Sequence, residues 1–369
     1  MKKLNIGVIG CGIISDVYLK NLTAGYSTLR VAACADILAE KSRAQAEKYG
    51  IESVEADTLL ADPGIDVVLN LTTPQFHKDI SLAAIQSGKH VYSEKPLAVT
   101  LADGREILDA AAARGVRVGC APDTFLGASI QTAIKAVKDG WIGRPLSAVA
   151  CFSCRGHERW HTSPDFYYQT GGGPVLDNAP YFLTALAAAL GRVKRVNAMA
   201  GRGFDRRMIG AGPRQGEFIP VDIDTHVSAS LEFENGVIVT SLWSFDIWAT
   251  HLPAIEIYGS GGTLTLPVPS GFDGPVLLKG MDGADFRELP RLYPHSGNLR
   301  GLGLAQMCHA ILHGGEHSAS GALALHVLEV MCAMEQSAKT GETVACQTAC
   351  PIPEQLVPGI LEKEYGFRD

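Results

Sequence analysis

The segment LNIGVIGCGIISDVYL constrains the fold of this chain more than any other stretch. A short apolar run with strand character ends at Gly10, and a helix-compatible spacing begins after Gly12, with Ile13 and Ile14 between the glycines and Ser15. Gly10 permits a tight turn, Gly12 lets the backbone approach a diphosphate, and Ser15 is small enough for helix and strand to pack. The diphosphate would then lie at the helix N-terminus. The pattern predicts a dinucleotide site on these residues, and the alternative is a glycine-rich turn with no ligand.

A second run with strand character, LRVAACAD, ends in Asp36. A carboxylate close to this position accepts hydrogen bonds from the ribose hydroxyls of the adenosine, whereas a 2'-phosphate would meet like charge. The cofactor we expect is therefore NAD(H) in preference to NADP(H). In the alternative reading, Asp36 only caps the helix that follows it.

Strands and helices continue to alternate through VVLNLTT and HVYSE, which predicts a doubly wound parallel sheet, an α/β fold. Ligands of such sheets bind at the carboxyl ends of the strands. We expect the cofactor to contact residues at these ends: Thr72, Thr73, Pro74, His77, Glu94 and Lys95.

The length of 369 residues indicates two domains, because single cores stop growing at roughly 250 to 300 residues. We place the dinucleotide domain at 1–123 and a substrate-binding and oligomerisation domain at 124–369. After a helix near 129–139, the pattern changes to alternating strands. Asn235 and Gly236 predict the turn of one hairpin, and AIEIYGSGGTLTLP predicts another. Two helices near 299–313 and 321–339 should flank the first domain or return to it.

The segment GGGPVLDNAPYFL carries the most chemistry in the second half. Its glycines let the backbone pass close to a ligand, and Asp177 and Tyr181 stand four residues apart, on one face of a helix. Upstream, CRGHERWHTSP gathers Arg155, His157 and Trp160, the kind of donors and aromatic faces that hold hydroxyl-rich substrates. A lid or a subunit contact is the other reading of that segment, and a buried tyrosine bonded to Asp177 is the other reading of Tyr181.

Over nearly its whole length the chain resembles the glucose-fructose oxidoreductase, inositol dehydrogenase and MocA-like (Gfo/Idh/MocA) oxidoreductase family. The stretches that carry the resemblance are GVIGCGIIS, AAIQSGKHVYSEKPLA and GGGPVLDNAPYFLTAL. It implies an N-terminal Rossmann domain and a C-terminal α+β domain with an open, mostly antiparallel sheet. It also implies hydride transfer between a nicotinamide and a secondary alcohol or carbonyl of a sugar, a polyol or a related molecule.

By this resemblance Lys95 is the active-site lysine, and Glu94 and Pro96 shape the turn that presents it. An ammonium at a strand end can stabilise the charge that develops on a substrate oxygen; otherwise Lys95 is a surface lysine before a helix-starting proline. Most of the family carries Asp-x-x-x-His where this chain has Asp177 and Tyr181. A nearby ammonium would favour the phenolate of Tyr181, so that Tyr181 could relay the proton beside Lys95 and Asp177.

Other classes of function fit less well. The net charge of −7 argues against nucleic acid, and no run approaches the ~20 apolar residues of a membrane span. Nine cysteines without paired metal-ligand spacing indicate reduced thiols, a cytoplasmic protein and no metal. We expect a homodimer or homotetramer. The remaining rivals are an NAD-dependent glycoside hydrolase, a dihydrodiol-type dehydrogenase and a non-catalytic nucleotide sensor.

Overall fold

The computed structural model describes residues 2–283, 285–354 and 356. They form two compact units. The first contains the chain up to Ala128, Leu292–Leu325 and the segment from Pro353, and the second contains Ser129–Arg291 and His326–Ile352. The expected division between 123 and 124 stays a prediction, since each unit draws on segments that lie far apart in the sequence.

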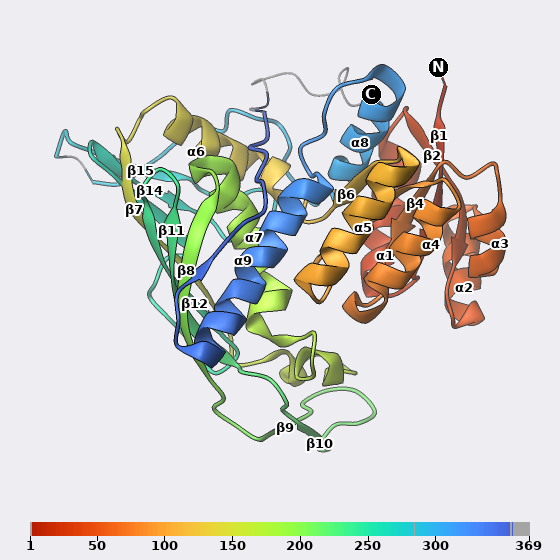
Figure 1. Ribbon diagram of the computed structural model, residues 1–369, viewed down its shortest axis with the longest axis horizontal. Helices are drawn as coiled ribbons and strands as arrows, with labels where there is room; N and C mark the ends of the chain where they lie inside the picture. The colour runs from red at the N-terminus through yellow and green to blue at the C-terminus, as the bar shows by residue number, and fades with distance from the viewer. Residues whose placement is uncertain (1, 284, 355, 357–369) are drawn as a thin grey trace. The chain divides into compact units, whose positions relative to one another are not determined.

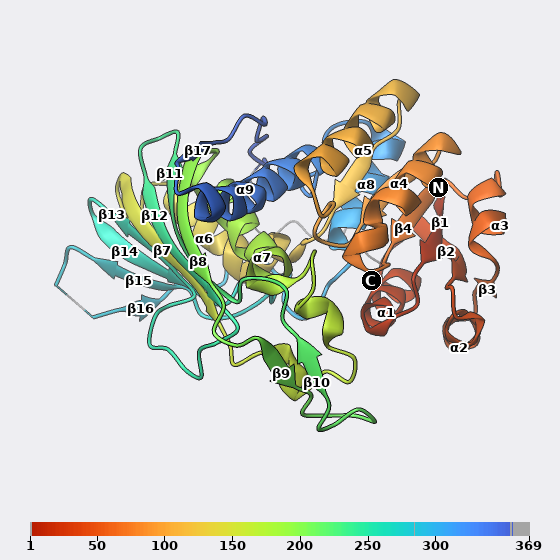
Figure 2. The ribbon, with the colours of Figure 1, turned by 60° about the horizontal axis from the view of Figure 1, so that its bottom comes forward.

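The first unit is a six-stranded parallel sheet with helices on both faces (Figure 2). Its strands follow the order β3-β2-β1-β4-β5-β6, and they are β1 (Leu4–Ile9), β2 (Leu29–Ala35), β3 (Glu52–Ser53), β4 (Val67–Asn70), β5 (His90–Ser93) and β6 (Val118–Cys120). Its helices are α1 (Ile13–Gly25), α2 (Ala39–Tyr49), α3 (Ala56–Ala61), α4 (His77–Gln86), α5 (Leu101–Arg114) and α8 (Leu302–His313). Every residue of β4 is buried, as expected for a strand covered on both faces. The predicted doubly wound sheet is confirmed.

The helices of this unit begin and end at residues whose chemistry explains the boundary. Thr100 caps α5, because its hydroxyl accepts a 3.1 Å hydrogen bond from the backbone N–H of Asp103. Gly115 ends the same helix in the left-handed region, at φ 67°. This cap sets the start of the helix that follows the Glu94–Pro96 turn.

The helix α8 joins the first unit although it lies late in the sequence. The buried carboxylate of Asp123 accepts hydrogen bonds from the backbone N–H groups of Gly301 (2.8 Å) and Gly303 (3.1 Å) at the N-terminus of α8. An acidic side chain at this end of a helix satisfies free N–H groups and opposes the positive end of the helix dipole.

The second unit contains a nine-stranded mixed sheet (Figure 1). Its order is β16-β15-β14-β13-β7-β12-β11-β8-β17, and the strands are β7 (Pro145–Ser153), β8 (Val193–Gly201), β11 (His226–Phe233), β12 (Ile238–Ser244), β13 (Ile255–Gly259), β14 (Gly262–Leu266), β15 (Leu277–Gly280), β16 (Arg287–Glu288) and β17 (Val344–Ala345). Among the described strands, β7 and β12 run parallel and all other neighbours antiparallel. Both predicted hairpins, β11–β12 and β13–β14, are confirmed.

One face of this sheet carries α6 (Ala128–Lys138), α7 (Gly173–Leu190) and most of α9 (Gly321–Thr340) (Figure 2). The helix α7 packs on β7, β11 and β12. Ser337 of α9 accepts a 2.9 Å hydrogen bond from the backbone N–H of Ala198 in β8. The segment between β8 and β11 forms a separate two-stranded ribbon of β9 (Arg206–Met208) and β10 (Phe218–Pro220). The predicted mostly antiparallel second sheet is confirmed.

Candidate active site

The turn between β1 and α1 requires glycine at position 10. Gly10 has φ 102°, and a Cβ there would lie 2.6 Å from the carbonyl carbon of Leu71 and 2.8 Å from the nitrogen of Thr72. No side chain larger than hydrogen fits in this conformation and this space. The turn therefore passes against the end of β4, as the predicted fingerprint demands.

The N-terminus of α1 has the shape of a diphosphate site. A Cβ on Gly12 would have no heavy atom of the described chain within 4 Å, and no side chain caps the helix. Ile13 is 81% exposed, Ile14 is half-buried, and the hydroxyl of the buried Ser15 donates to the carbonyl of Gly12 at 2.7 Å. Open space over uncapped N–H groups fits an anionic dinucleotide.

Asp36 lies at the end of β2 beside this turn. Its Oδ2 accepts from the backbone N–H of Cys11 at 2.6 Å, and its Oδ1 accepts from that of Leu38 at 2.9 Å. The N-cap residue of α2 is Leu38 and not Asp36. The carboxylate is thus held against the fingerprint turn, and each oxygen retains lone pairs for ribose hydroxyls.

The ring of His77 contacts the segment that follows β4. Thr72 is half-buried, Thr73 is exposed and Pro74 begins a short 3₁₀ helix (Pro74–Phe76). The fully buried ring of His77 places Nε2 2.9 Å from the carbonyl oxygen of Thr72 and Nδ1 2.6 Å from that of Pro96. Burial lowers the pKa of His77, and the two carbonyls partly oppose this effect. His77 therefore joins two loops, and the structure gives it no exposed surface for a cofactor.

The Glu94–Pro96 turn explains why an acid, a cation and a proline stand in a row. The buried carboxylate of Glu94 accepts from the phenol of Tyr18 at 2.8 Å and from the backbone N–H of Lys95 at 2.9 Å. The Lys95–Pro96 peptide bond is cis, and His77 holds the carbonyl of Pro96. The backbone is thus fixed on both sides of Lys95, whose side chain is half-buried.

In the second unit, α7 begins at the last glycine of the triplet, Gly173, and carries the predicted pair. A Cβ on Gly172 would lie 2.7 Å from backbone atoms of Tyr167, so that only glycine fits here. Asp177 and Tyr181, one helical turn apart, are both half-buried. The amide of Asn178 donates to Oδ2 of Asp177 at 2.8 Å.

The structure brings His157 to Asp177. Nε2 of His157 lies 3.0 Å from Oδ2 of Asp177, and the side chains are 14% and 21% exposed. The imidazole is enclosed by aromatic rings, with centroid distances of 4.5 Å to Tyr167, 4.8 Å to Phe245 and 5.5 Å to Trp160. Of the three residues predicted to bind substrate upstream of α7, His157 is the one that contacts the predicted catalytic aspartate.

The other two residues of that prediction, Arg155 and Trp160, do not contact Asp177 in the described contacts. The guanidinium of Arg155 stacks on Phe204 at 4.6 Å and on Trp248 at 5.1 Å. Trp160 is largely exposed, with its edge against the ring of His157. Of these two side chains, Trp160 thus contacts the ring of His157, and Arg155 packs on Phe204 and Trp248.

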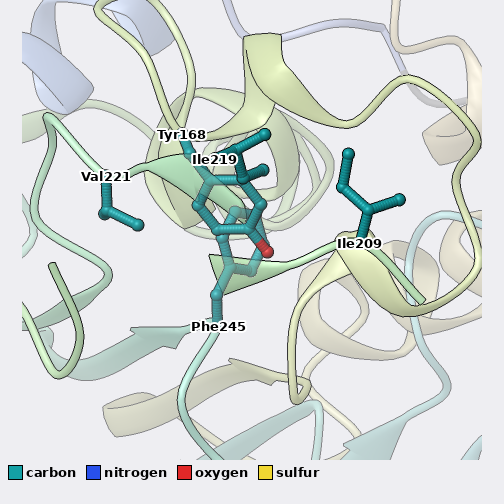
Figure 3. Close-up of a cluster of buried hydrophobic side chains, with 5 residues drawn as sticks. All are labelled: Tyr168, Ile209, Ile219, Val221 and Phe245. Carbon is teal, nitrogen blue, oxygen red and sulfur yellow. The ribbon is translucent and has the colours of Figure 1, made fainter. Parts of the chain in front are cut away.

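A buried ionic network, which the sequence pattern did not indicate, anchors the loop that carries His157. Arg207 of β9 is paired with Glu158 at 3.1 Å and with Asp246, and the hydroxyl of Tyr168 also bonds Glu158. Around this network Tyr168 and Phe245 pack with the aliphatic side chains Ile209, Ile219 and Val221 (Figure 3). Breaking such a buried pair costs on the order of 3 to 5 kcal/mol, so the loop is held firmly.

Comparison with known proteins assigns both parts of the chain. Residues 4–121 match the oxidoreductase family with an NAD-binding Rossmann fold, and residues 130–265 match the GFO/IDH/MocA C-terminal domain. A 1,5-anhydro-D-fructose reductase of Ensifer adhaerens is 30% identical over 84% of this chain and 89% of its own length. The chain belongs to the Gfo/Idh/MocA oxidoreductase family.

Two further proteins are similar to this chain, one in sequence and one in fold. A dTDP-3,4-didehydro-2,6-dideoxy-alpha-D-glucose 3-reductase of Streptomyces violaceoruber is 31% identical over 79% of this chain and 81% of its own length. A levoglucosan dehydrogenase in complex with NADH and L-sorbose shares the fold, with a TM-score of 0.80, 22% identity and coverage of 94% of this chain and 100% of its own. The chain is therefore an oxidoreductase with an NAD(P)-binding Rossmann domain, from a family that acts on sugar CH–OH groups.

Two further observations bear on the sequence-based expectations. In the described part of the chain, no group of three or more His, Cys, Asp or Glu side chains is placed to hold a metal ion. Over the same residues, none of the helices is both long enough and apolar enough to span a membrane.

Proposed function

We propose that this protein is an NAD(H)-preferring dehydrogenase that acts on a secondary alcohol, or the corresponding carbonyl, of a sugar or polyol. The observation that carries the proposal is the fixed Glu94–Pro96 turn, which presents Lys95 from the end of β5 in the unit that contains the dinucleotide fingerprint. The nicotinamide, when bound, supplies the hydride acceptor or donor. NADH in the levoglucosan dehydrogenase structure and the carboxylate of Asp36 support NAD(H) as the cofactor.

Residues of this chain bind the cofactor, stabilise the developing charge and transfer the proton. Gly10 permits the tight turn, Gly12 leaves room for the diphosphate, and Asp36 accepts hydrogen bonds from ribose hydroxyls. Lys95 stabilises the negative charge that develops on the substrate oxygen. Asp177 and Tyr181 on α7 take part in substrate binding and proton transfer, as the resemblance to the family implies.

Sugars and polyols are the substrates that the relatives favour. The three similar proteins are named for an anhydrofructose, a dideoxy-glucose nucleotide and levoglucosan. Arg155, His157 and Trp160 offer donors and aromatic surface near Asp177, as hydroxyl-rich ligands require. We also propose a cytoplasmic homodimer or homotetramer, because an open sheet has to be covered.

A substrate panel tests the proposal. The purified protein is incubated with NAD and with sugars, anhydrosugars, inositols and aromatic diols, and NADH formation is followed by absorbance. Net NADH with a sugar or inositol supports the proposal. Turnover of a glycoside without net NADH would favour a hydrolase that borrows and returns hydride, and oxidation of aromatic diols alone would favour the dihydrodiol type.

A further inference from the structure

The hydrogen-bond pattern at Asp177 fixes the position of a proton on His157. Oδ2 of Asp177 receives the amide of Asn178 at 2.8 Å, so that this oxygen acts as an acceptor. The same oxygen lies 3.0 Å from Nε2 of His157, and Nε2 is therefore the donor of that contact. In a neutral imidazole one nitrogen carries hydrogen and the other a lone pair. Nδ1 of His157 is then the basic nitrogen.

The ring is held in place for that role. The rings of Tyr167, Phe245 and Trp160 surround the imidazole, and the backbone N–H of His157 donates to the hydroxyl of Tyr168 at 3.1 Å. Within the described residues, no hydrogen bond engages Nδ1, and the side chain is 14% exposed. A base with a fixed tautomer, an oriented ring and an accessible lone pair is preorganised for proton transfer.

The titratable groups that face the ring are few. Asp177 faces it from α7, Tyr167 from the 3₁₀ helix Asp165–Tyr167, and His161 from its own segment. Burial lowers the pKa of His161 and so disfavours the charged form of this neighbour. The carboxylate of Asp177 thus faces the ring as the acceptor of the hydrogen bond from Nε2.

We propose that His157 takes up and returns the substrate proton, while Asp177 orients its ring and stabilises its charged form. His157 would supply from a loop the imidazole that most of the family carries at the position of Tyr181. In alcohol oxidation the O–H bond breaks, its electron pair forms the carbonyl, the proton passes to Nδ1, and the hydride leaves with NAD as its acceptor. This inference rests on the proposed function.

The first test needs neither substrate nor cofactor. Nitrogen-15 NMR of the histidine side chains, assigned with His157→Asn, reports which ring nitrogen carries hydrogen in the neutral form. The parent should show a pyridine-type Nδ1 and a protonated Nε2 at His157, and Asp177→Ala should give a mixture of tautomers. A protonated Nδ1 in the parent, or a tautomer that Asp177→Ala leaves unchanged, would overturn the pairing.

The second test is kinetic. His157→Asn should lower kcat for sugar oxidation on the order of a hundredfold and remove the acidic limb of its pH profile, with little change in NADH affinity. The matched control is His161→Asn, four residues away in the same aromatic cluster, which should keep the rate and the limb. Tyr181→His in the His157→Asn background should restore part of the rate.

The outcomes separate the two proposals. A His157→Asn variant that keeps the parent's rate and acidic limb would overturn the role of His157, and so would an equal loss in His161→Asn. A parent protein that oxidises no member of the panel would contradict the proposed function, whereas the tautomer measurement would still decide whether Asp177 orients His157.

Discussion

The phenol of Tyr18, on the helix that begins at the dinucleotide fingerprint, donates a 2.8 Å hydrogen bond to Oε1 of Glu94. Both side chains are buried, and burial together with the negative charge of Glu94 raises the pKa of Tyr18, so that the phenol remains a donor. The other oxygen of Glu94 accepts from the backbone of Lys95. The position of Lys95 thus depends on the helix α1, at whose N-terminus we propose that the diphosphate binds.

Tyr18→Phe should therefore weaken both stability and turnover. Loss of the donor leaves a buried carboxylate oxygen unsatisfied, which lowers the free energy of unfolding by about 1 to 3 kcal/mol. Turnover should fall as Lys95 loses its fixed position. Denaturant unfolding and steady-state kinetics measure the two effects. The control is Tyr49→Phe, which removes a phenol bonded to Asp16 of the same helix α1 and leaves the bond to Glu94 in place.

The parent should bind NADH more tightly than NADPH, because the carboxylate of Asp36 repels a 2'-phosphate. Asp36→Asn keeps an oxygen that accepts from Cys11 and removes the charge, so that the preference should shrink. Fluorescence titration of both reduced cofactors measures the ratio. Tighter binding of NADPH by the parent would show that Asp36 does not accept hydrogen bonds from the ribose hydroxyls of the cofactor.

Lys95→Met should lower turnover on the order of a hundredfold or more, with the fold and nucleotide binding nearly intact, because one preorganised donor is lost. The matched control is Lys78→Met, which removes an ammonium paired with Asp103 and Glu106 on the same unit. Lys78→Met should turn over like the parent. Unchanged kinetics in Lys95→Met would reduce the Glu94–Pro96 turn to a structural role.

Tyr181→Phe separates two possible proton carriers. If His157 takes the proton, the variant should lose turnover through one missing hydrogen bond and keep the acidic limb of the pH profile. If the phenol itself relays the proton, the limb should move or vanish. The kcat profile of Tyr181→Phe over pH, compared with that of the parent, decides between them. Behaviour equal to the parent at every pH would make Tyr181 a packing residue.

Asp123 should make the stability of the protein depend on pH. Burial raises its pKa from 3.8 to about 6, although the N–H groups of Gly303 and Gly301 act in the opposite direction. A carboxyl with a raised pKa in the folded state binds protons better there than in the unfolded chain. Its favourable contribution is therefore complete below the unfolded value and is lost as pH rises through about 6.

The variant Asp123→Asn isolates this effect. The free energy of unfolding of the parent, minus that of the variant, should fall on the order of 2 to 3 kcal/mol between about pH 4 and pH 7. Denaturant titrations at several pH values measure this difference. A difference that is constant, or that rises with pH, would contradict the raised pKa.

Local patterns in the sequence predicted much of the fold and the candidate residues. Gly10 and the hairpin at Gly236 follow from the backbone conformations that only glycine adopts readily, since φ is 102° and 85° there. The placement of Asp177 and Tyr181 on one face of a helix follows from their spacing of four residues. Such features depend on a few consecutive residues and are visible in any single sequence.

Contacts between distant residues could not be predicted in the same way. Asp123 meets Gly301 across 178 positions, and Arg207 meets Glu158 across 49. A single buried pair produces no periodic pattern in the sequence, because the contact does not depend on which residues lie next to either partner along the chain. The same holds for the contact of His157 with Asp177: the sequence indicates each residue as a site candidate, but not that the two side chains meet.

The bond from Asp123 to the start of α8 also bears on the order in which the protein can fold during synthesis. The strands β1 to β6 are translated well before Leu292–Leu325, although both belong to the same unit. Until then the Asp123 carboxylate has no helix end to cap. The nucleotide-binding unit therefore lacks this contact until the ribosome has translated Leu292–Leu325.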